Sequence, residues 1–354
     1  MATELDRSDR GLAEYVDERL AQLDDPPAAP LTLGIYWTGS CGGCDANVAD
    51  LGEALLALSS HVDVAIWPLA TDFKPADVER LETDEIDICL FNGAIRLDDH
   101  EEMAHLLRDR SRTLVAYGAC AHLGGIPGLA EFSSPDDLVR TKYEDVPTVT
   151  GGESPRGETD VESGRLELPT LRDGVDRLED VVDVEYTVPG CPPSRRFTAD
   201  LLLSALEEDL PEPGTVLAGD GHVCRECPRE VDERHLESLE RVHEVEPADG
   251  ECLLNEGLVC LGPLTAAGCN ARCLEANVPC RGCFGPAEST CDVGAQLASS
   301  LGPLVEPDGD DEVAAIVDEV EDWAGLTHYF TLADSPLGQV QDPAVDDDRG
   351  DRDE

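Results

Sequence analysis

The dense cysteine content of one short segment constrains the fold of this chain more than any other feature. The stretch CLGPLTAAGCNARCLEANVPCRGC, residues 260–283, holds five of the fourteen cysteines, with glycine and proline between them. Regular hydrophobic periodicity is missing from residues 211–286, and the segment has little apolar material for a core of its own. Metal–thiolate bonds can supply folding energy where hydrophobic burial does not. The sequence therefore predicts that this segment folds around metal sites.

These thiols are expected in a reducing compartment. Residues 1–20 lack the apolar run after a basic start that marks a secretory signal peptide. No stretch approaches the about 18 apolar residues that a membrane span requires. We therefore expect a cytoplasmic protein without a membrane span, whose cysteines bind metal rather than form disulfides.

The charge of the chain is extreme. It has 77 Asp and Glu against 25 Lys and Arg, a net charge of −52. Such a field repels nucleic acid and anionic membrane surfaces, so neither is expected as a partner. The hydrophobic content of 41% is high enough for a folded core. At molar salt the Debye length is about 3 Å, which removes most self-repulsion. The composition therefore predicts a folded, halophilic protein of haloarchaeal origin.

Strand-like and helix-like patterns alternate in the first part of the chain. Apolar strand-like runs include LTLGIYW, VDVAIWPL, IDICLFNG, RTLVAYG and VDVEYTVPG, and helical patterns lie between them, for example at 45–58 and 99–110. This alternation predicts βαβ units and an α/β, flavodoxin-like, doubly wound parallel sheet, followed by a Cys-rich domain with little regular secondary structure. In such sheets ligands bind beyond the carboxyl ends of the strands.

Four parts of the chain are predicted from these patterns. They are an amphipathic helix (11–23) and linker in 1–30, a flavodoxin-like domain at 31–210 with an insert at 133–175 that contains a short hairpin, a ferredoxin-like two-cluster domain at 211–300, and a helix (311–326) with an acidic tail in 301–354.

Four cysteines follow predicted strands at the point where each strand ends. Cys41 and Cys44 lie in TGSCGGCD, Cys120 in YGACAHLGGIPG and Cys191 in VPGCPP. Because the carboxyl ends of parallel strands share one edge of the sheet, we expect these thiols to converge. Neighbouring glycines would let the backbone approach a bulky inorganic ligand. The alternative is a set of core cysteines or a redox CxxC pair. Cys89, within a strand-like run, is interpreted as a buried apolar thiol.

The second domain contains enough thiols for two further sites. CxxC pairs occur at Cys224 with Cys227 and at Cys280 with Cys283, and nine cysteines lie between residues 224 and 291. Sets of four thiolates suit either zinc or an iron–sulfur cluster. The mixture of CxxC and CxxxC spacings, with Pro and Gly close by, favours two cubane clusters over two zinc ribbons.

Four motifs together resemble the small, electron-transferring subunit of [NiFe] hydrogenases. They are CGGC, GACAHLGGIPG, VPGCPP and the Cys-rich stretch at 252–286, and they occur in the order typical of that family. The resemblance covers residues 31–286 and is strongest to the cytoplasmic non-F420-reducing, methyl-viologen-type and sulfhydrogenase branch. The first domain also resembles the 20 kDa subunit of complex I.

The resemblance implies three [4Fe–4S] clusters and two protein partners, a nickel-carrying large subunit and a further redox subunit that donates or accepts electrons. The implied ligands are Cys41, Cys44, Cys120 and Cys191 for the proximal cluster, Cys269, Cys273, Cys280 and Cys283 for the medial cluster, and Cys224, Cys227, Cys252 and Cys260 for the distal cluster. This chain alone is not expected to activate H2. Cys291 has no counterpart in the family pattern.

Other interpretations stay open at this point. Asp72 is a candidate ligand of the proximal cluster, although a solvated carboxylate is favoured, and His222 is an alternative ligand beside Cys224. The chain could serve a complex I-like oxidoreductase whose partner lacks nickel. It could also be a zinc-stabilised structural module, since zinc would use the same thiols.

Overall fold

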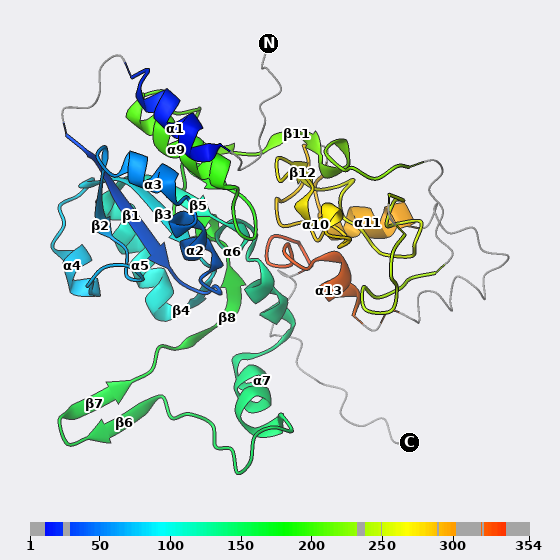
Figure 1. Ribbon diagram of the computed structural model, residues 1–354. Coiled ribbons are helices and arrows are strands. Elements are labelled where there is room, and N and C mark those ends of the chain that lie inside the picture. The colour runs from blue at the N-terminus through cyan, green and yellow to red at the C-terminus, as the bar shows by residue number, and fades with distance from the viewer. Residues whose placement is uncertain are drawn as a thin grey trace.

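A parallel six-stranded sheet forms the centre of the first part of the molecule (Figure 1). The computed structural model describes residues 11–23, 29–231, 238–248, 250–288, 290–301, 320 and 322–337. Residues 302–319, which include most of the predicted C-terminal helix, and the predicted acidic tail lie outside the described residues. Neighbouring strands pair in parallel in the order β10-β9-β5-β3-β1-β2. The strands are β1 (Leu31–Trp37), β2 (Val62–Ile66), β3 (Ile86–Asn92), β5 (Ser111–Tyr117), β9 (Tyr186–Val188) and β10 (Thr215–Val216).

The predicted α/β fold class is thus confirmed, with a switch point in strand order beside β1. From β1 the chain passes to β2 on one side and later to β3 on the other side. At a switch point of this kind the connections diverge and leave a crevice at the carboxyl ends of the strands. Strand β10 extends the sheet beyond the expected domain limit at residue 210. The strand was not predicted, because two residues show no detectable alternation of apolar and polar side chains.

Helices cover both faces of this sheet (Figure 1). One face packs against α1 (Leu12–Leu20), α2 (Gly43–Ala49), α3 (Glu53–Leu58) and α9 (Arg195–Leu206). The other packs against α4 (Pro75–Glu79), α5 (Asp98–Arg110) and α8 (Leu178–Val181). The single helix predicted at 45–58 is in fact two helices. Gly52 adopts a φ of 58° between them, a conformation that interrupts a right-handed helix.

The Cys-rich part has little regular structure, as predicted, but its expected lack of a core is wrong. Its elements are β11 (Gly219–His222), η3 (Val223–Arg225), β12 (Ala266–Ala267), α10 (Arg272–Glu275) and α11 (Val293–Leu301). Buried Leu253, Leu254, Leu258, Leu261 and Leu264 form an apolar cluster with Cys260 and Cys280. These leucines lie in loops, so their spacing follows no helical or strand period. Across the described residues, no helix has the length and apolar character needed to cross a membrane.

A C-terminal segment packs against both parts of the molecule. It contains α13 (Trp323–Thr327), which lies between the sheet domain and the Cys-rich part in Figure 1. The Gly125 N–H donates to the Phe330 carbonyl at 3.1 Å. Asp334 forms an ion pair with Arg177. Phe330 also joins a small apolar cluster with Ala119, Leu123 and Cys283. This segment therefore connects loops that carry cysteines of both parts.

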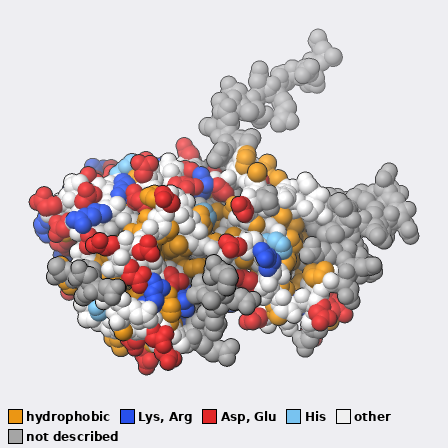
Figure 2. Space-filling view, turned by 90° about the horizontal axis from the view of Figure 1, so that it is seen from above, with side chains coloured by type: hydrophobic (Ala, Val, Ile, Leu, Met, Phe, Trp, Pro, Cys, Tyr) orange, Lys and Arg blue, Asp and Glu red, His pale blue; other side chains and the backbone are white. Residues whose placement is uncertain are grey.

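Carboxylates dominate the surface. Figure 2 shows Asp and Glu side chains spread over the visible face, with fewer Lys and Arg among them. Some arginines pair with several carboxylates at once. Arg177, for example, contacts both Glu179 and Asp180 at 2.7 Å. With 77 acidic and 25 basic side chains in the sequence, most carboxylates cannot have a cationic partner of their own.

The predicted insert projects from the body of the molecule (Figure 1). It follows η1 (Ile126–Phe132) and contains α7 (Pro135–Arg140), η2 (Thr141–Asp145) and an antiparallel hairpin of β6 (Glu158–Val161) with β7 (Gly164–Glu167). The chain returns through β8 (Leu171–Asp176), which pairs with β4 (Ile95–Leu97).

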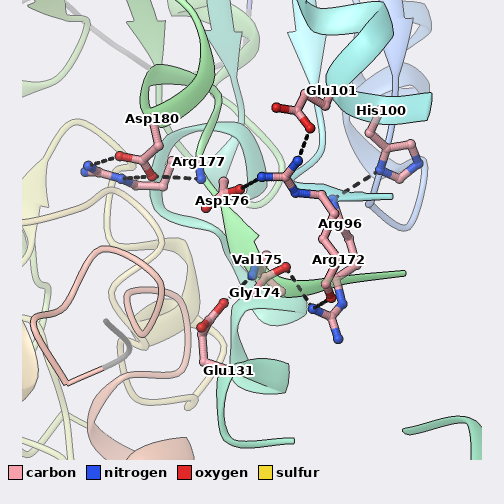
Figure 3. A network of polar contacts seen from close by, with 10 residues as sticks. All are labelled: Arg96, His100, Glu101, Glu131, Arg172, Gly174, Val175, Asp176, Arg177 and Asp180. Atoms are coloured by element: carbon pink, nitrogen blue, oxygen red, sulfur yellow. Dashed lines mark hydrogen bonds and ion pairs between the residues drawn. The ribbon is translucent and has the colours of Figure 1, made fainter. Parts of the chain in front are cut away.

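A polar network fixes the base of this insert (Figure 3). The buried Arg96 guanidinium donates to the carbonyls of Arg172 at 2.7 Å and Gly174 at 2.8 Å. The Arg172 side chain pairs with Glu101 of α5 and, at 2.6 Å, with Asp176. These contacts hold the point at which the insert returns to the sheet domain, close to the loops that follow β5.

Candidate metal-cluster sites

Four thiols from three loops converge at the carboxyl edge of the sheet. Cys41 follows β1, Cys44 lies in the first turn of α2, Cys120 lies in α6 (Ala119–Leu123) after β5, and Cys191 follows β9. The Cys44 thiol interacts electrostatically with those of Cys120, Cys191 and Cys41. Cys120 interacts with Cys191 and Cys41 as well. We call this set site 1; it lies beside the switch point, where the sequence analysis expected convergence.

Glycines leave room for the sulfur atoms of site 1. A Cβ added to Gly118, whose φ is 93°, would lie 2.5 Å from the Cys44 Sγ. A Cβ at Gly125, with a φ of 59°, would lie 2.7 Å from the Cys120 Sγ and 2.8 Å from its Cα. Real Cβ atoms do not approach other atoms so closely. The backbone therefore comes near these thiols only because both positions are glycine.

Burial favours the protonated form of two site 1 thiols, those of Cys44 and Cys120. Desolvation raises the pKa of Cys44 far above its usual value and that of Cys120 to about 12. Desolvation also raises the pKa of the Asp45 carboxyl, although Trp67 and Asn92 donate to it at 3.1 and 2.8 Å. Asp45 was not predicted from the sequence. Its one sequence signal is its position directly after Cys44. Because a metal ligand must be a thiolate, metal binding here would release protons.

A second set of four thiols surrounds a cavity of about 220 Å³, which we call site 2. Cys269, Cys273, Cys280 and Cys283 line this cavity, together with Cys191 of site 1. A water molecule occupies about 30 Å³ in the liquid, so the volume of the cavity is several times that of one water molecule. Desolvation raises the pKa of Cys269 to about 11 and that of Cys280 to about 12, and both thiols interact with Cys273.

A third set, site 3, lies in the apolar cluster of the Cys-rich part. The Cys260 thiol interacts electrostatically with Cys224 and Cys252, and desolvation raises its pKa to about 12. A Cβ added to Gly262 would lie 3.3 Å from the Cys224 Sγ and 3.5 Å from the Cys260 Sγ, so these two sulfurs border the same space. Cys227 packs against the same cluster of buried residues.

Site 2 adjoins both of the other sites. Cys191 of site 1 lines the cavity of site 2, and its thiol interacts electrostatically with Cys273 of site 2. The Cys280 N–H of site 2 donates to the Cys260 Sγ of site 3 at 3.4 Å. Site 2 thus lies between the other two. Spacing alone did not predict these contacts.

In the described part of the chain, no three His, Cys, Asp or Glu side chains are grouped as one metal ion requires. Around one zinc ion, four sulfurs would lie about 4 Å apart. In a [4Fe–4S] cluster each of the four thiolates binds a different iron, so the sulfurs surround a larger cage.

The remaining candidates lie elsewhere. Cys89 is fully buried within β3, which confirms its interpretation as an apolar core thiol. Cys291 and Asp72 are exposed to solvent. His222 lies in β11, and its Nδ1 is buried without a hydrogen-bond partner in the described residues.

Comparisons with known proteins agree on one group of redox subunits. Residues 41–205 match the family model of the 20 kDa subunit of NADH ubiquinone oxidoreductase. A vhu subunit of the F420-non-reducing hydrogenase of Methanocaldococcus jannaschii is 34% identical over 87% of this chain and 96% of its own. The corresponding subunit of the F420-non-reducing hydrogenase of Methanothermobacter marburgensis is 32% identical over 86% of this chain and 95% of its own.

Two further proteins are more distant. The sulfhydrogenase 2 subunit delta of Pyrococcus furiosus is 28% identical over 72% of this chain and 86% of its own. A solved structure, that of an NAD+-reducing [NiFe]-hydrogenase in the H2-reduced state, is 29% identical with a TM-score of 0.45, and the match covers 52% of this chain and 94% of that chain.

Proposed function

This chain belongs to the F420-non-reducing hydrogenase iron–sulfur subunit family, and we propose that it is the electron-transfer subunit of a [NiFe]-hydrogenase-type complex. It would relay electrons between the active site of a large-subunit partner and an external acceptor through three [4Fe–4S] clusters. The observation that carries this proposal is the series of three thiol sets, in which Cys191 of site 1 lines the cavity of site 2 and the Cys280 N–H of site 2 donates to the Cys260 Sγ of site 3. Each bound cluster would accept and release one electron.

The side chains present suit this cofactor. Cys41, Cys44, Cys120 and Cys191 would hold the proximal cluster in site 1. Cys269, Cys273, Cys280 and Cys283 would hold the medial cluster in site 2, and Cys224, Cys227, Cys252 and Cys260 the distal cluster in site 3. The glycines beside site 1 and the cavity lined by the site 2 thiols support this assignment. Buried apolar residues around site 3 would exclude water from it.

Site 1 has the exposure expected of a surface that meets the large subunit. The Cys41 and Cys191 side chains are exposed. Trp37, whose ring lies beside Gly42, and Ile126, which follows Gly125 beside Cys120, are 41% and 45% exposed. Covering these side chains with a partner would remove apolar surface from water. We further propose a cytoplasmic location, a halophilic source and a further redox subunit that exchanges electrons with site 3.

Anaerobic reconstitution of the full chain with iron and sulfide tests the cluster count. We expect brown protein with about twelve irons per chain, four for each of three cubanes, and an electron paramagnetic resonance (EPR) signal after dithionite reduction. Colourless protein that binds stoichiometric zinc and gives no EPR signal would contradict the proposal and favour the structural module.

A complex I-like role is the second candidate, favoured by the match of residues 41–205 to the 20 kDa subunit model. It uses the same clusters with a partner that lacks nickel. Purifying the native complex separates the two candidates. Nickel in the complex, together with H2-dependent reduction of a viologen dye, supports the hydrogenase, whereas clusters without nickel or H2 activity support the alternative.

Replacing Gly125 by alanine should prevent assembly of site 1. The new Cβ would overlap Cys120, and we expect about eight irons per chain instead of about twelve, because one cubane is lost. Gly151→Ala is the matched control. Its φ of 65° is close to the 59° of Gly125, but nothing lies within 4 Å of its added Cβ. Iron analysis of both variants after reconstitution distinguishes two effects of alanine. Backbone strain occurs in both variants, whereas overlap of the new Cβ with Cys120 occurs only in Gly125→Ala. Full iron content in Gly125→Ala would show that this close approach is not needed.

A further inference from the structure

The Thr265 side chain contacts a thiol of site 2. Its hydroxyl lies 3.5 Å from the Cys280 Sγ, and the residue is only 1% exposed. Thr265 also lines the cavity that the four site 2 thiols surround. It is therefore a buried hydroxyl at the position where Cys280 would bind iron.

Once Cys280 is a thiolate, the Thr265 hydroxyl can donate to either of two acceptors, the Leu261 carbonyl or the Cys280 sulfur. In the structure it donates to the Leu261 carbonyl at 2.7 Å, while the Cys280 thiol donates to its oxygen. A cluster-bound sulfur has lost its proton and can only accept. The Leu261 carbonyl also accepts from the Leu264 N–H at 3.0 Å, so it keeps a partner if the hydroxyl turns towards sulfur. Rotation about one bond is enough for this exchange.

Other groups around Cys280 also favour negative charge on its sulfur. The Gly282 backbone favours the thiolate form of Cys280 and so opposes the rise in the pKa of this thiol. The Arg281 guanidinium interacts electrostatically with Cys260 and Cys280. A carboxylate lies near one thiol at each of sites 1 and 2, Asp45 near Cys44 and Glu226 near Cys269. Hydrogen bonds to sulfur and local charge are among the factors that set the potential of a cluster.

We propose that Thr265 is a positioning residue that donates a hydrogen bond to the iron-bound Cys280 sulfur and raises the reduction potential of the site 2 cluster. Adding one electron increases the negative charge on the cluster and its thiolates. A hydroxyl donor stabilises that reduced state more than the oxidised state. This inference rests on the proposed three-cluster function.

An EPR-monitored redox titration of the reconstituted full chain tests the role of Thr265. We compare the wild-type chain with Thr265→Val, which keeps the shape but loses the hydroxyl, and Thr265→Ser, which keeps the hydroxyl. In the valine variant one of the three couples should become about tenfold harder to reduce, a negative shift of about 59 mV for a one-electron couple. The serine variant should titrate close to the wild type. Iron content and visible spectra check that all the proteins carry the same clusters.

Other results of the titration contradict the inference in distinguishable ways. If no couple moves in Thr265→Val, or if serine shifts the same couple as far as valine, the hydroxyl has no such role. If the valine variant does not load iron, the comparison of Thr265→Ser with Thr265→Ala asks the same question with smaller side chains. A wild-type chain without three couples would overturn the proposed function itself, whereas three couples that do not respond would overturn only the role of Thr265.

Discussion

Cys191→Ser should reduce the iron content of the reconstituted chain from about twelve to about eight and interrupt electron flow from the large subunit. Cys191 belongs to site 1 and also lines the cavity of site 2. Serine keeps a side chain of similar shape but replaces the soft thiolate ligand. Changes to groups that merely support a metal ligand cost about 10–100-fold in affinity or activity, so loss of a ligand should lower H2-dependent dye reduction by more than about 100-fold.

Cys291→Ser is the matched control for this variant. Cys291 is exposed, as Cys191 is, but it belongs to none of the three thiol sets. Iron analysis, EPR and dye reduction by the native complex should therefore match the wild type in Cys291→Ser. Twelve irons and full activity in Cys191→Ser would contradict the proposed proximal cluster in site 1.

A second large effect is expected from salt. The melting temperature of the chain should rise by on the order of 10 °C between low salt and molar KCl. The net charge is −52, and one arginine, Arg177, already pairs with Glu179, Asp180 and Asp334. Raising the salt from 0.1 M to 1 M shortens the Debye length from about 10 to about 3 Å and screens repulsion among the unpaired carboxylates. A gain of about 7 kcal/mol corresponds to a rise of this size in a chain of this length.

Thermal unfolding followed by circular dichroism measures this effect. The control is a neutral osmolyte at the same osmolality, which is excluded from the protein surface but screens no charge. We expect it to raise the melting temperature much less than KCl does. Equal or greater stability at low salt would contradict the inference of a halophilic protein.

The alternation of strand and helix patterns predicted the sheet domain well. Strands β3 and β5 each contain four consecutive buried apolar residues, at 88–91 and 114–117, which is typical of a parallel sheet buried on both faces. The topology of the sheet also explains why the sequence positions of Cys41, Cys120 and Cys191 predicted one shared site. They follow β1, β5 and β9, whose carboxyl ends share one edge. The break at Gly52 and the short β10 were missed, because neither changes the local periodicity.

The Cys-rich part was less predictable, because its residues meet through loops. Leu253, Leu258 and Leu264 are buried around Cys260, although their spacing follows no period. Thr265 is an ordinary hydroxyl residue in the sequence, and only the folding of residues 261–280 places it beside Cys280.

The amino-acid sequence by itself determined the fold class, the excess of negative charge and the supply of thiols, because strand periodicity, composition and CxxC spacing are local properties. Only the tertiary structure decided that site 2 lies between the other two and that the Cys280 N–H donates to the Cys260 sulfur. These arrangements join residues far apart in the chain, such as Cys191 with the cysteines of site 2, and they depend on how irregular loops pack. Such packing leaves no repeating pattern in the sequence.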